Sequence, residues 1–157
     1  MDSYLLVIGY GNTLRRDDGV GPRVAARVEE LRLPGVLTMA CPQLTPELAD
    51  PVSQAGAVVF VDASVEQRGP VRMRRLGPSD SSQILAHAAD PRILLALARD
   101  AFGRAPQAWI VTIPARELGF GERLSRPASL GLRDAVRAVR ALHRRLPGRR
   151  RARPRTA

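Results

Sequence analysis

Residues 4–21 read YLLVIGYGNTLRRDDGVG. The stretch begins as an apolar run that ends at Gly9, which is typical of a buried strand. A polar loop follows at residues 11–16, and apolar residues then recur at helical spacing from Val20 to Leu31. A strand, a loop and a helix in this order are the first half of a βαβ unit, so the stretch predicts a largely parallel sheet.

The same alternation continues along the rest of the chain. Apolar or alternating runs predict further strands at 36–40, 57–61, 71–76 and 108–113, of which 71–76 has the pattern of an edge strand. Further helices are predicted to begin at Pro46 with Thr45 as N-cap, and to span 91–102 and 128–146. This order predicts an α/β fold, a three-layer α/β/α sandwich of the phosphorylase/hydrolase-like kind with a mostly parallel twisted sheet of about five strands. Functional sites in such sheets lie beyond the carboxyl ends of the strands.

The composition of the chain excludes several classes of protein and of functional site. The 157 residues suit one domain, predicted at 1–146, and a hydrophobic content of 45% is enough for a core. The 4% aromatic content argues against a stacking platform for single-stranded nucleic acid. One cysteine excludes a disulfide framework, and two histidines mean that any metal site relies largely on carboxylates. No apolar run reaches the roughly 20 residues of a membrane span, and the N-terminus lacks a basic signal-peptide start, so we expect a cytoplasmic protein without membrane contact. We also expect a monomer.

The formal net charge of +10 is concentrated at the C-terminus. All 25 basic residues are arginines, and seven of them lie in 144–157, where there is no acid. The rest of the chain carries only +3, so the body is nearly balanced. We predict an arginine-rich, disordered tail at 147–157, because proline and glycine interrupt it. It is either a solvated terminus or a tether for nucleic acid or another acidic partner.

The loop after the first predicted strand has the Gly-x-Gly of a dinucleotide-binding loop, but Leu14 occupies the position of the third glycine. Asp17 and Asp18 at the helix entry would also repel a pyrophosphate, so nucleotide binding is disfavoured. One of these acids could cap the helix that starts at Val20. Both cannot cap it, which leaves the other free to point into a cleft.

Three residues form a candidate metal site. Asp62 ends the most apolar strand, where it is either a turn cap or a site residue. His87 lies in a loop that leads into a helix. Together with Asp18, these residues come from three loops at one edge of the predicted sheet, and two carboxylates with one imidazole suit a weakly bound divalent transition metal. His143 is interpreted as a surface residue, and no local base supports Cys41 as a nucleophile.

The segment 7–21 resembles the N-terminal signature of the nickel–iron hydrogenase maturation endopeptidases: an apolar strand, Gly-x-Gly-Asn-x-Leu, two variable residues, an acidic pair and Gly-Val-Gly. Three later segments of the chain resemble later segments of that family in the same order, namely 58–63, 86–97 and 121–125. The resemblance covers residues 4–146. The chain departs from the family at Cys41–Leu48, where many members carry a glycine-rich segment with threonine, and at Ala86, where serine is common.

The resemblance implies an aspartic-type endopeptidase that removes the C-terminal extension from the precursor of a [NiFe] hydrogenase large subunit after nickel insertion. It assigns the catalytic and metal-contacting positions to Asp18, Asp62 and His87, with aspartate at position 18 where glutamate is frequent. Nickel is expected to arrive with the precursor, so no tightly bound metal is expected at rest. We expect the nickel to dock and orient the cleavage site, since no nucleophile–base pair is visible. The alternatives are a similar fold that acts on another precursor or only binds metal, and a nucleic-acid-associated protein that uses its basic tail.

Overall fold

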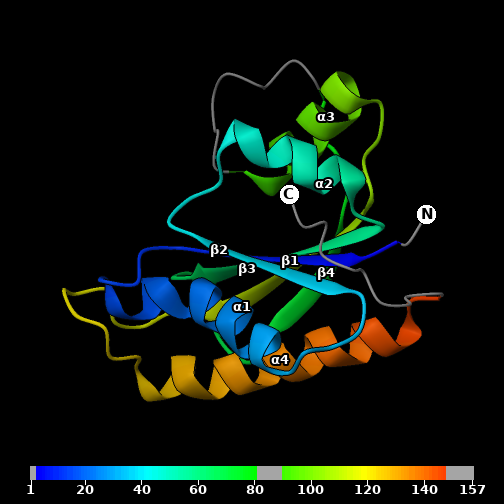
Figure 1. The fold of residues 1–157 in the computed structure, drawn as a ribbon. Coiled ribbons are helices and arrows are strands. Elements are labelled where there is room, and N and C mark those ends of the chain that lie inside the picture. The colour runs from blue at the N-terminus through cyan, green and yellow to red at the C-terminus, as the bar shows by residue number, and fades with distance from the viewer. Residues whose placement is uncertain (1–2, 81–89, 148–157) are drawn as a thin grey trace.

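The computed structural model describes residues 3–80 and 90–147. It contains five strands, four α-helices and two short 3-10 helices within these ranges (Figure 1). In chain order they are β1 (Leu5–Tyr10), η1 (Arg16–Gly19), α1 (Val20–Glu30), β2 (Val36–Cys41), η2 (Pro46–Leu48), α2 (Ala49–Gln54), β3 (Ala57–Ser64), β4 (Arg72–Leu76), α3 (Pro91–Phe102), β5 (Gln107–Pro114) and α4 (Arg126–Arg145).

The strands form one sheet in the order β2-β1-β3-β5-β4. All neighbouring pairs are parallel except β4 and β5, so β4 is the antiparallel edge strand. Helices α2 and α3 cover one face, and α1 and α4 cover the other (Figure 1). The predicted three-layer sandwich and the predicted edge strand at 71–76 are both confirmed.

The central strand β3 shows why its sequence is a continuous apolar run. Val59 and Val61 pack toward α1 and α4, while Val58 and Phe60 pack toward α2 and α3. All four side chains are buried, because a parallel sheet covered on both faces leaves neither side of its central strands in water. The alternation continues to Asp62, which therefore shares the α2–α3 face with Phe60.

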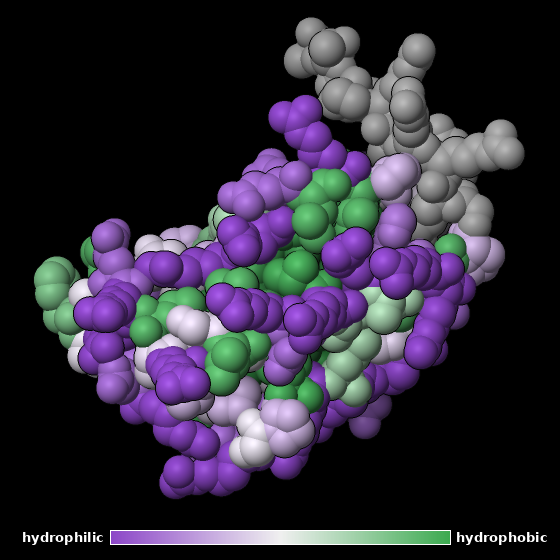
Figure 2. All heavy atoms as spheres, turned by 90° about the horizontal axis from the view of Figure 1, so that it is seen from below, coloured by the Kyte–Doolittle hydropathy of each residue, from purple (hydrophilic) through white to green (hydrophobic). Residues whose placement is uncertain are grey.

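Helix α4 is amphipathic, with a buried face of small residues that fits closely on the sheet. A Cβ atom on Gly131 would lie 2.5 Å from a methyl carbon of Ile113. The outer face exposes mainly arginines, among them Arg133, Arg137 and Arg140. Figure 2 shows hydrophilic side chains over much of this side of the molecule, with apolar atoms visible between them. No helix in the described ranges is long and apolar enough to cross a membrane.

Two predicted helix starts need correction. The Thr45 side chain does not cap the following helix, and Pro46 opens the 3-10 turn η2, which precedes the α-helix. Helix α4 begins at Arg126, two residues before the predicted start, because the Ser125 hydroxyl accepts a hydrogen bond from the Ala128 N–H at 3.3 Å and caps it. The arginine-rich segment predicted at 147–157 lies outside the described residues beyond Pro147 and stays a prediction.

Two glycines bring the start of α1 directly against the sheet. A Cβ atom on Gly9 would lie 2.0 Å from the Gly21 carbonyl oxygen, and one on Gly21 would lie 2.5 Å from the Val61 carbonyl oxygen. No side chain fits in these gaps, so backbone packs on backbone at this point. The close approach places η1, which immediately precedes α1, beside the carboxyl ends of β1 and β3.

Candidate active site

Asp62 lies within β3, not after it as predicted. The strand continues to Ser64, because the pairing with β5 extends as far as Pro114. Asp62 pairs in register with Thr112, which in turn pairs with Arg72 of β4. Paired residues of a sheet project to the same face, so these three side chains lie in one row at the carboxyl end of the sheet.

The Asp62 side chain lines a cleft of about 740 Å³. Tyr10 of β1 lies on the same wall, and the remaining lining residues come from the end of β4, the following turn, the start of α3 and Ile110 of β5. Among them are Arg74 and Arg92, so both acidic and basic residues line the cleft. The predicted position of the site, at the carboxyl edge of the sheet, agrees with this cleft.

Burial raises the pKa of the Asp62 carboxyl from 3.8 to about 6. Hydrogen bonds from the Tyr10 hydroxyl and the Ala63 N–H oppose this rise, and the nearby negative charge of Asp18 adds to it. The pKa of Tyr10 is itself raised, first by burial and then by the charge of Asp62 and the hydrogen bond to it. A carboxyl that ionises near pH 6 can bind a metal or take up a proton in the neutral range.

Asp18 lies in η1, partly exposed, and its charge reaches Asp62. Its Oδ2 atom accepts a hydrogen bond from the Asn12 N–H at 2.7 Å, and the Asn12 Oδ1 atom accepts one from the Leu14 N–H at 2.9 Å. The loop 11–16 therefore folds back over the Asp18 carboxylate. Of the three predicted site residues, Asp18 and Asp62 therefore lie on neighbouring elements, close enough for the charge of Asp18 to raise the pKa of Asp62.

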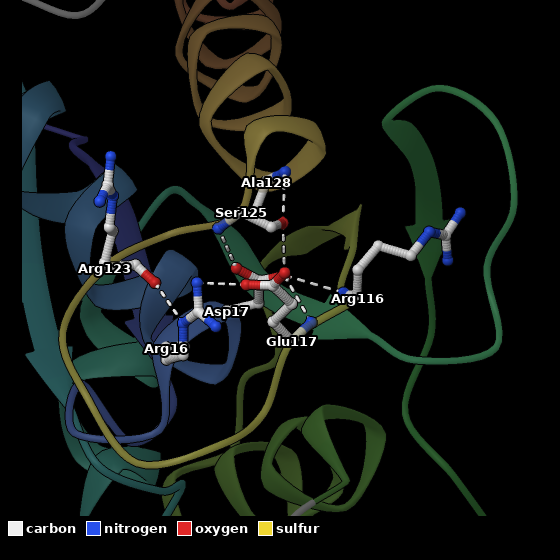
Figure 3. A network of polar contacts seen from close by, with 7 residues as sticks. All are labelled: Arg16, Asp17, Arg116, Glu117, Arg123, Ser125 and Ala128. Atoms are coloured by element: carbon white, nitrogen blue, oxygen red, sulfur yellow. Dashed lines mark hydrogen bonds and ion pairs between the residues drawn. The ribbon is translucent and has the colours of Figure 1, made fainter.

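Asp17 is fully buried and does not line the cleft. Its side chain points into a network that includes the start of α4 (Figure 3). Burial alone would raise its pKa, but hydrogen bonds from Ser125 and from the Arg116 and Glu117 N–H groups lower the pKa overall. The prediction that Asp17 or Asp18 caps α1 is wrong. Gly19 precedes α1, and no side-chain hydrogen bond caps that helix.

The third predicted ligand, His87, lies outside the described residues. Within the described ranges, no group of three or more histidine, cysteine, aspartate or glutamate side chains is arranged to hold a metal ion. Burial raises the pKa of Cys41, which does not favour a nucleophilic thiolate. The Nε2 atom of His143 lies 2.8 Å from the Pro34 carbonyl oxygen, so this half-buried histidine ties α4 to the turn before β2, near the amino ends of the strands.

Sequence reasoning missed Tyr10, which lines the cleft and donates a hydrogen bond to Asp62, and Ser125, which bonds the buried Asp17. Tyr10 stands between two glycines at the end of a strand, so the alternation of β1 could have placed it beside Asp62. Ser125 precedes Arg126 and Pro127, a pattern that marks a helix N-cap, but its bond to Asp17 spans 108 residues and has no local signal.

Solved structures with this arrangement of strands and helices have been described. The hydrogenase maturating endopeptidase HybD from E. coli is 20% identical to the chain, with a TM-score of 0.70 over 90% of this chain and 93% of that one. The [NiFe] hydrogenase maturation protease HybD from Thermococcus kodakarensis is 23% identical, with a TM-score of 0.68 over 88% and 98%. This is the fold of the hydrogenase maturation endopeptidases.

A third neighbour of the same fold, an uncharacterized protein from Wolinella succinogenes, is 25% identical, with a TM-score of 0.66 over 91% of this chain and 98% of that one. No protein-family model matches the sequence, and no curated protein matches it. The maturation endopeptidase fold thus spans nearly the whole described chain, including the edge of the sheet that carries Asp18 and Asp62.

Proposed function

We propose that the chain is an endopeptidase that removes the C-terminal extension from the nickel-loaded precursor of a [NiFe] hydrogenase large subunit. The observation that carries the proposal is the meeting of Asp18 and Asp62 beside a cleft at the carboxyl edge of a maturation endopeptidase fold. The two acids come from segments 44 residues apart, and the backbone packing at Gly9 and Gly21 brings these segments together.

In this proposal, Asp18, Asp62 and His87 bind the nickel that the precursor carries. Two carboxylates and one imidazole leave coordination positions for ligands of the precursor, so the metal can dock the segment to be cut. Asp62 ionises near pH 6 and is available to the metal in its charged form at neutral pH. Docking holds the scissile peptide bond in the 740 Å³ cleft, and orientation is then the main contribution of the protein.

The test is incubation of the purified protein with a nickel-loaded large-subunit precursor, followed by intact-mass measurement of the product. We expect one cut that removes a C-terminal peptide. Asp18→Ala, Asp62→Ala and His87→Ala should each abolish the cut while the far-ultraviolet circular dichroism stays that of the folded chain. Asp134→Ala is a matched control, because Asp134 is an exposed acid on α4.

Processing at the wild-type rate by all three variants would refute the assignment of the site. An uncut hydrogenase precursor, with Ni²⁺ binding that depends on Asp18 and Asp62, would favour a similar fold that serves another precursor or only binds metal.

A further inference from the structure

The buried carboxylate of Asp17 has no role in the proposed metal site, yet it accepts four hydrogen bonds, all from residues about 100 positions away in the chain. We propose that Asp17 is a positioning residue that holds Asp18 in its metal-binding place by fastening η1 to the loop 115–125 and to the first turn of α4. This inference rests on the proposed function for the role of Asp18, but its geometry can be tested separately.

Four donors converge on the two oxygens of Asp17 (Figure 3). Oδ1 accepts from the Ser125 N–H at 2.7 Å. Oδ2 accepts from the Ser125 hydroxyl at 2.6 Å, the Arg116 N–H at 2.8 Å and the Glu117 N–H at 3.0 Å. The Asp17 N–H in turn donates to the Glu117 carbonyl oxygen at 2.9 Å. The residue directly before Asp18 is therefore fixed by partners about 100 residues away, in a fully buried place where such bonds are strong.

The donors require a carboxylate at this position. Three backbone N–H groups and one hydroxyl all point at Asp17, and an ionised carboxylate is acceptor-only. An asparagine has nearly the same shape, but its NH₂ group would face at least one of these donors. Asp17→Asn therefore breaks the network with very little change in volume.

A second set of contacts joins the same segments. The Arg16 N–H donates to the Gly121 carbonyl oxygen at 2.8 Å, and the Gly121 N–H donates to the Leu14 carbonyl oxygen at 2.7 Å. The Arg16 side chain bonds the Arg123 carbonyl oxygen and forms an ion pair with Glu117. Arg16 has a φ of 47°, a left-handed conformation that a non-glycine residue keeps only when its surroundings hold it there. Residues 14–17 are thus held in place by the distant loop 115–125.

Asp18 depends on this support. The hydrogen bond to its carboxylate comes from Asn12, within the same loop. The direction of the Asp18 side chain is therefore set by the backbone of η1, which Asp17 anchors. A small rotation of η1 would move the Asp18 oxygens relative to Asp62 while leaving both carboxylates in the site.

Ser125 offers a matched pair of variants. Its hydroxyl donates a hydrogen bond to Asp17 and accepts one from the Ala128 N–H. Ser125 therefore holds the Asp17 carboxylate and also caps α4. Ser125→Ala removes both bonds, whereas Ser125→Thr keeps the hydroxyl for both. Val139→Ala serves as a control for general destabilisation, because Val139 is fully buried in α4 and lies in the core cluster between α4 and the sheet.

The first readout is the Asn12 amide proton in the nuclear magnetic resonance spectrum of the ¹⁵N-labelled full chain. Its bond to the Asp18 carboxylate moves this signal downfield, and Asp18→Ala defines the position without the bond. We expect Asp17→Asn and Ser125→Ala to shift the signal toward that of Asp18→Ala, with Ser125→Thr and Val139→Ala close to wild type. An Asn12 signal that stays at the wild-type position in folded Asp17→Asn would overturn the proposal.

The second readout is the cleavage of the nickel-loaded precursor, measured well below the melting temperature of each variant. We expect kcat/KM to fall about tenfold or more in Asp17→Asn and Ser125→Ala, as is typical when a group that orients a metal ligand is removed. Ser125→Thr and Val139→Ala should keep the wild-type value. If wild type cuts no precursor, the proposed function fails, and the Asn12 signal still decides whether Asp17 positions Asp18. A fall in kcat/KM no larger than that of Val139→Ala would show that Asp17 is merely structural.

Discussion

Three aspartates near one edge of the sheet have different environments, and the difference shows in their pKa values. Asp17 is buried among hydrogen-bond donors, which keep it charged with a lowered pKa. Asp62 is half-buried, with fewer donors and a charged neighbour, Asp18, and its pKa is raised to about 6. Asp18 stays partly exposed. Environments that push the pKa values of neighbouring acids apart are typical of sites where one acid is structural and another takes part in binding or proton transfer.

The raised pKa of Asp62 predicts a loss of stability as the pH rises. The folded state holds the proton of Asp62 up to about pH 6, against 3.8 for the free side chain. Its contribution to stability is therefore complete below about pH 4 and is lost as the pH rises through 6. Between pH 4 and pH 7, we expect the free energy of unfolding of Asp62→Asn to rise by about 2 kcal/mol relative to that of wild type. Denaturant unfolding at each pH measures this difference.

Asp134→Asn is the control for that titration, since Asp134 is exposed on α4 and should show no such gain. A stability difference between Asp62→Asn and wild type that does not change with pH would contradict the raised pKa. Ni²⁺ affinity, in contrast, should increase over the same range, because a metal binds the ionised carboxylate.

At the scale of elements, the glycines of the first loop allow close backbone packing. Gly9 at the end of β1 and Gly21 in α1 let the helix start touch the carboxyl ends of β1 and β3. A dinucleotide-binding loop uses glycines in a similar way, but here Leu14 replaces its third glycine. Here the pattern places η1, with its two acids, against the end of the central strand.

Gly21→Ala should destabilise the fold and disturb the site. Its new methyl group would lie 2.5 Å from the Val61 carbonyl oxygen and 2.6 Å from that of Tyr10, and neither backbone atom can move freely. We expect a loss of about 1–3 kcal/mol in the free energy of unfolding, as measured by urea denaturation. Gly119→Ala is the matched control, because nothing lies within 4 Å of a Cβ atom there. Equal stability of the two variants would show that α1 can move away from the sheet.

At the scale of the whole molecule, the sheet separates two hydrophobic cores, one on each of its faces. The α1–α4 core contains Trp109, which is the single tryptophan of the chain, and the α2–α3 core contains Leu95 and Phe60. Because successive residues of each central strand belong to opposite cores, neither core can open without disturbing the strands of the other. The two layers are expected to unfold together.

Leu95→Ala tests this cooperativity. Leu95 is fully buried in α3, so the change should cost about 2–5 kcal/mol. Trp109 lies on the opposite face of the sheet, yet its fluorescence should report the same lowered midpoint as far-ultraviolet circular dichroism. A Trp109 transition that stays at the wild-type midpoint while the dichroism shifts would show two independent units.

Much of this fold could be predicted because its signals are local. The apolar runs of β1, β3 and β5 and the helical stripes of α1, α3 and α4 are decided by residues that are neighbours in the chain. The α3 bounds agree with the prediction, since Asp90 caps the helix, Pro91 opens it and Gly103 ends it. One error concerns long-range pairing, since β3 extends past Asp62 because β5 pairs with it. Another is local, since the Thr45 side chain does not cap the helix that follows it.

The sequence by itself determined the α/β class, predicted a site at the carboxyl edge of the sheet, and indicated Asp18 and Asp62 as candidate site residues. The place of His87 stays a prediction. Only the tertiary structure decided the buried hydrogen-bonded environment of Asp17 and the hydrogen bond between Tyr10 and Asp62. The physical reason is that hydrophobic periodicity is set by adjacent residues. The charge state and direction of a carboxylate depend on donors and burial that folding brings from distant parts of the chain, such as Ser125 for Asp17.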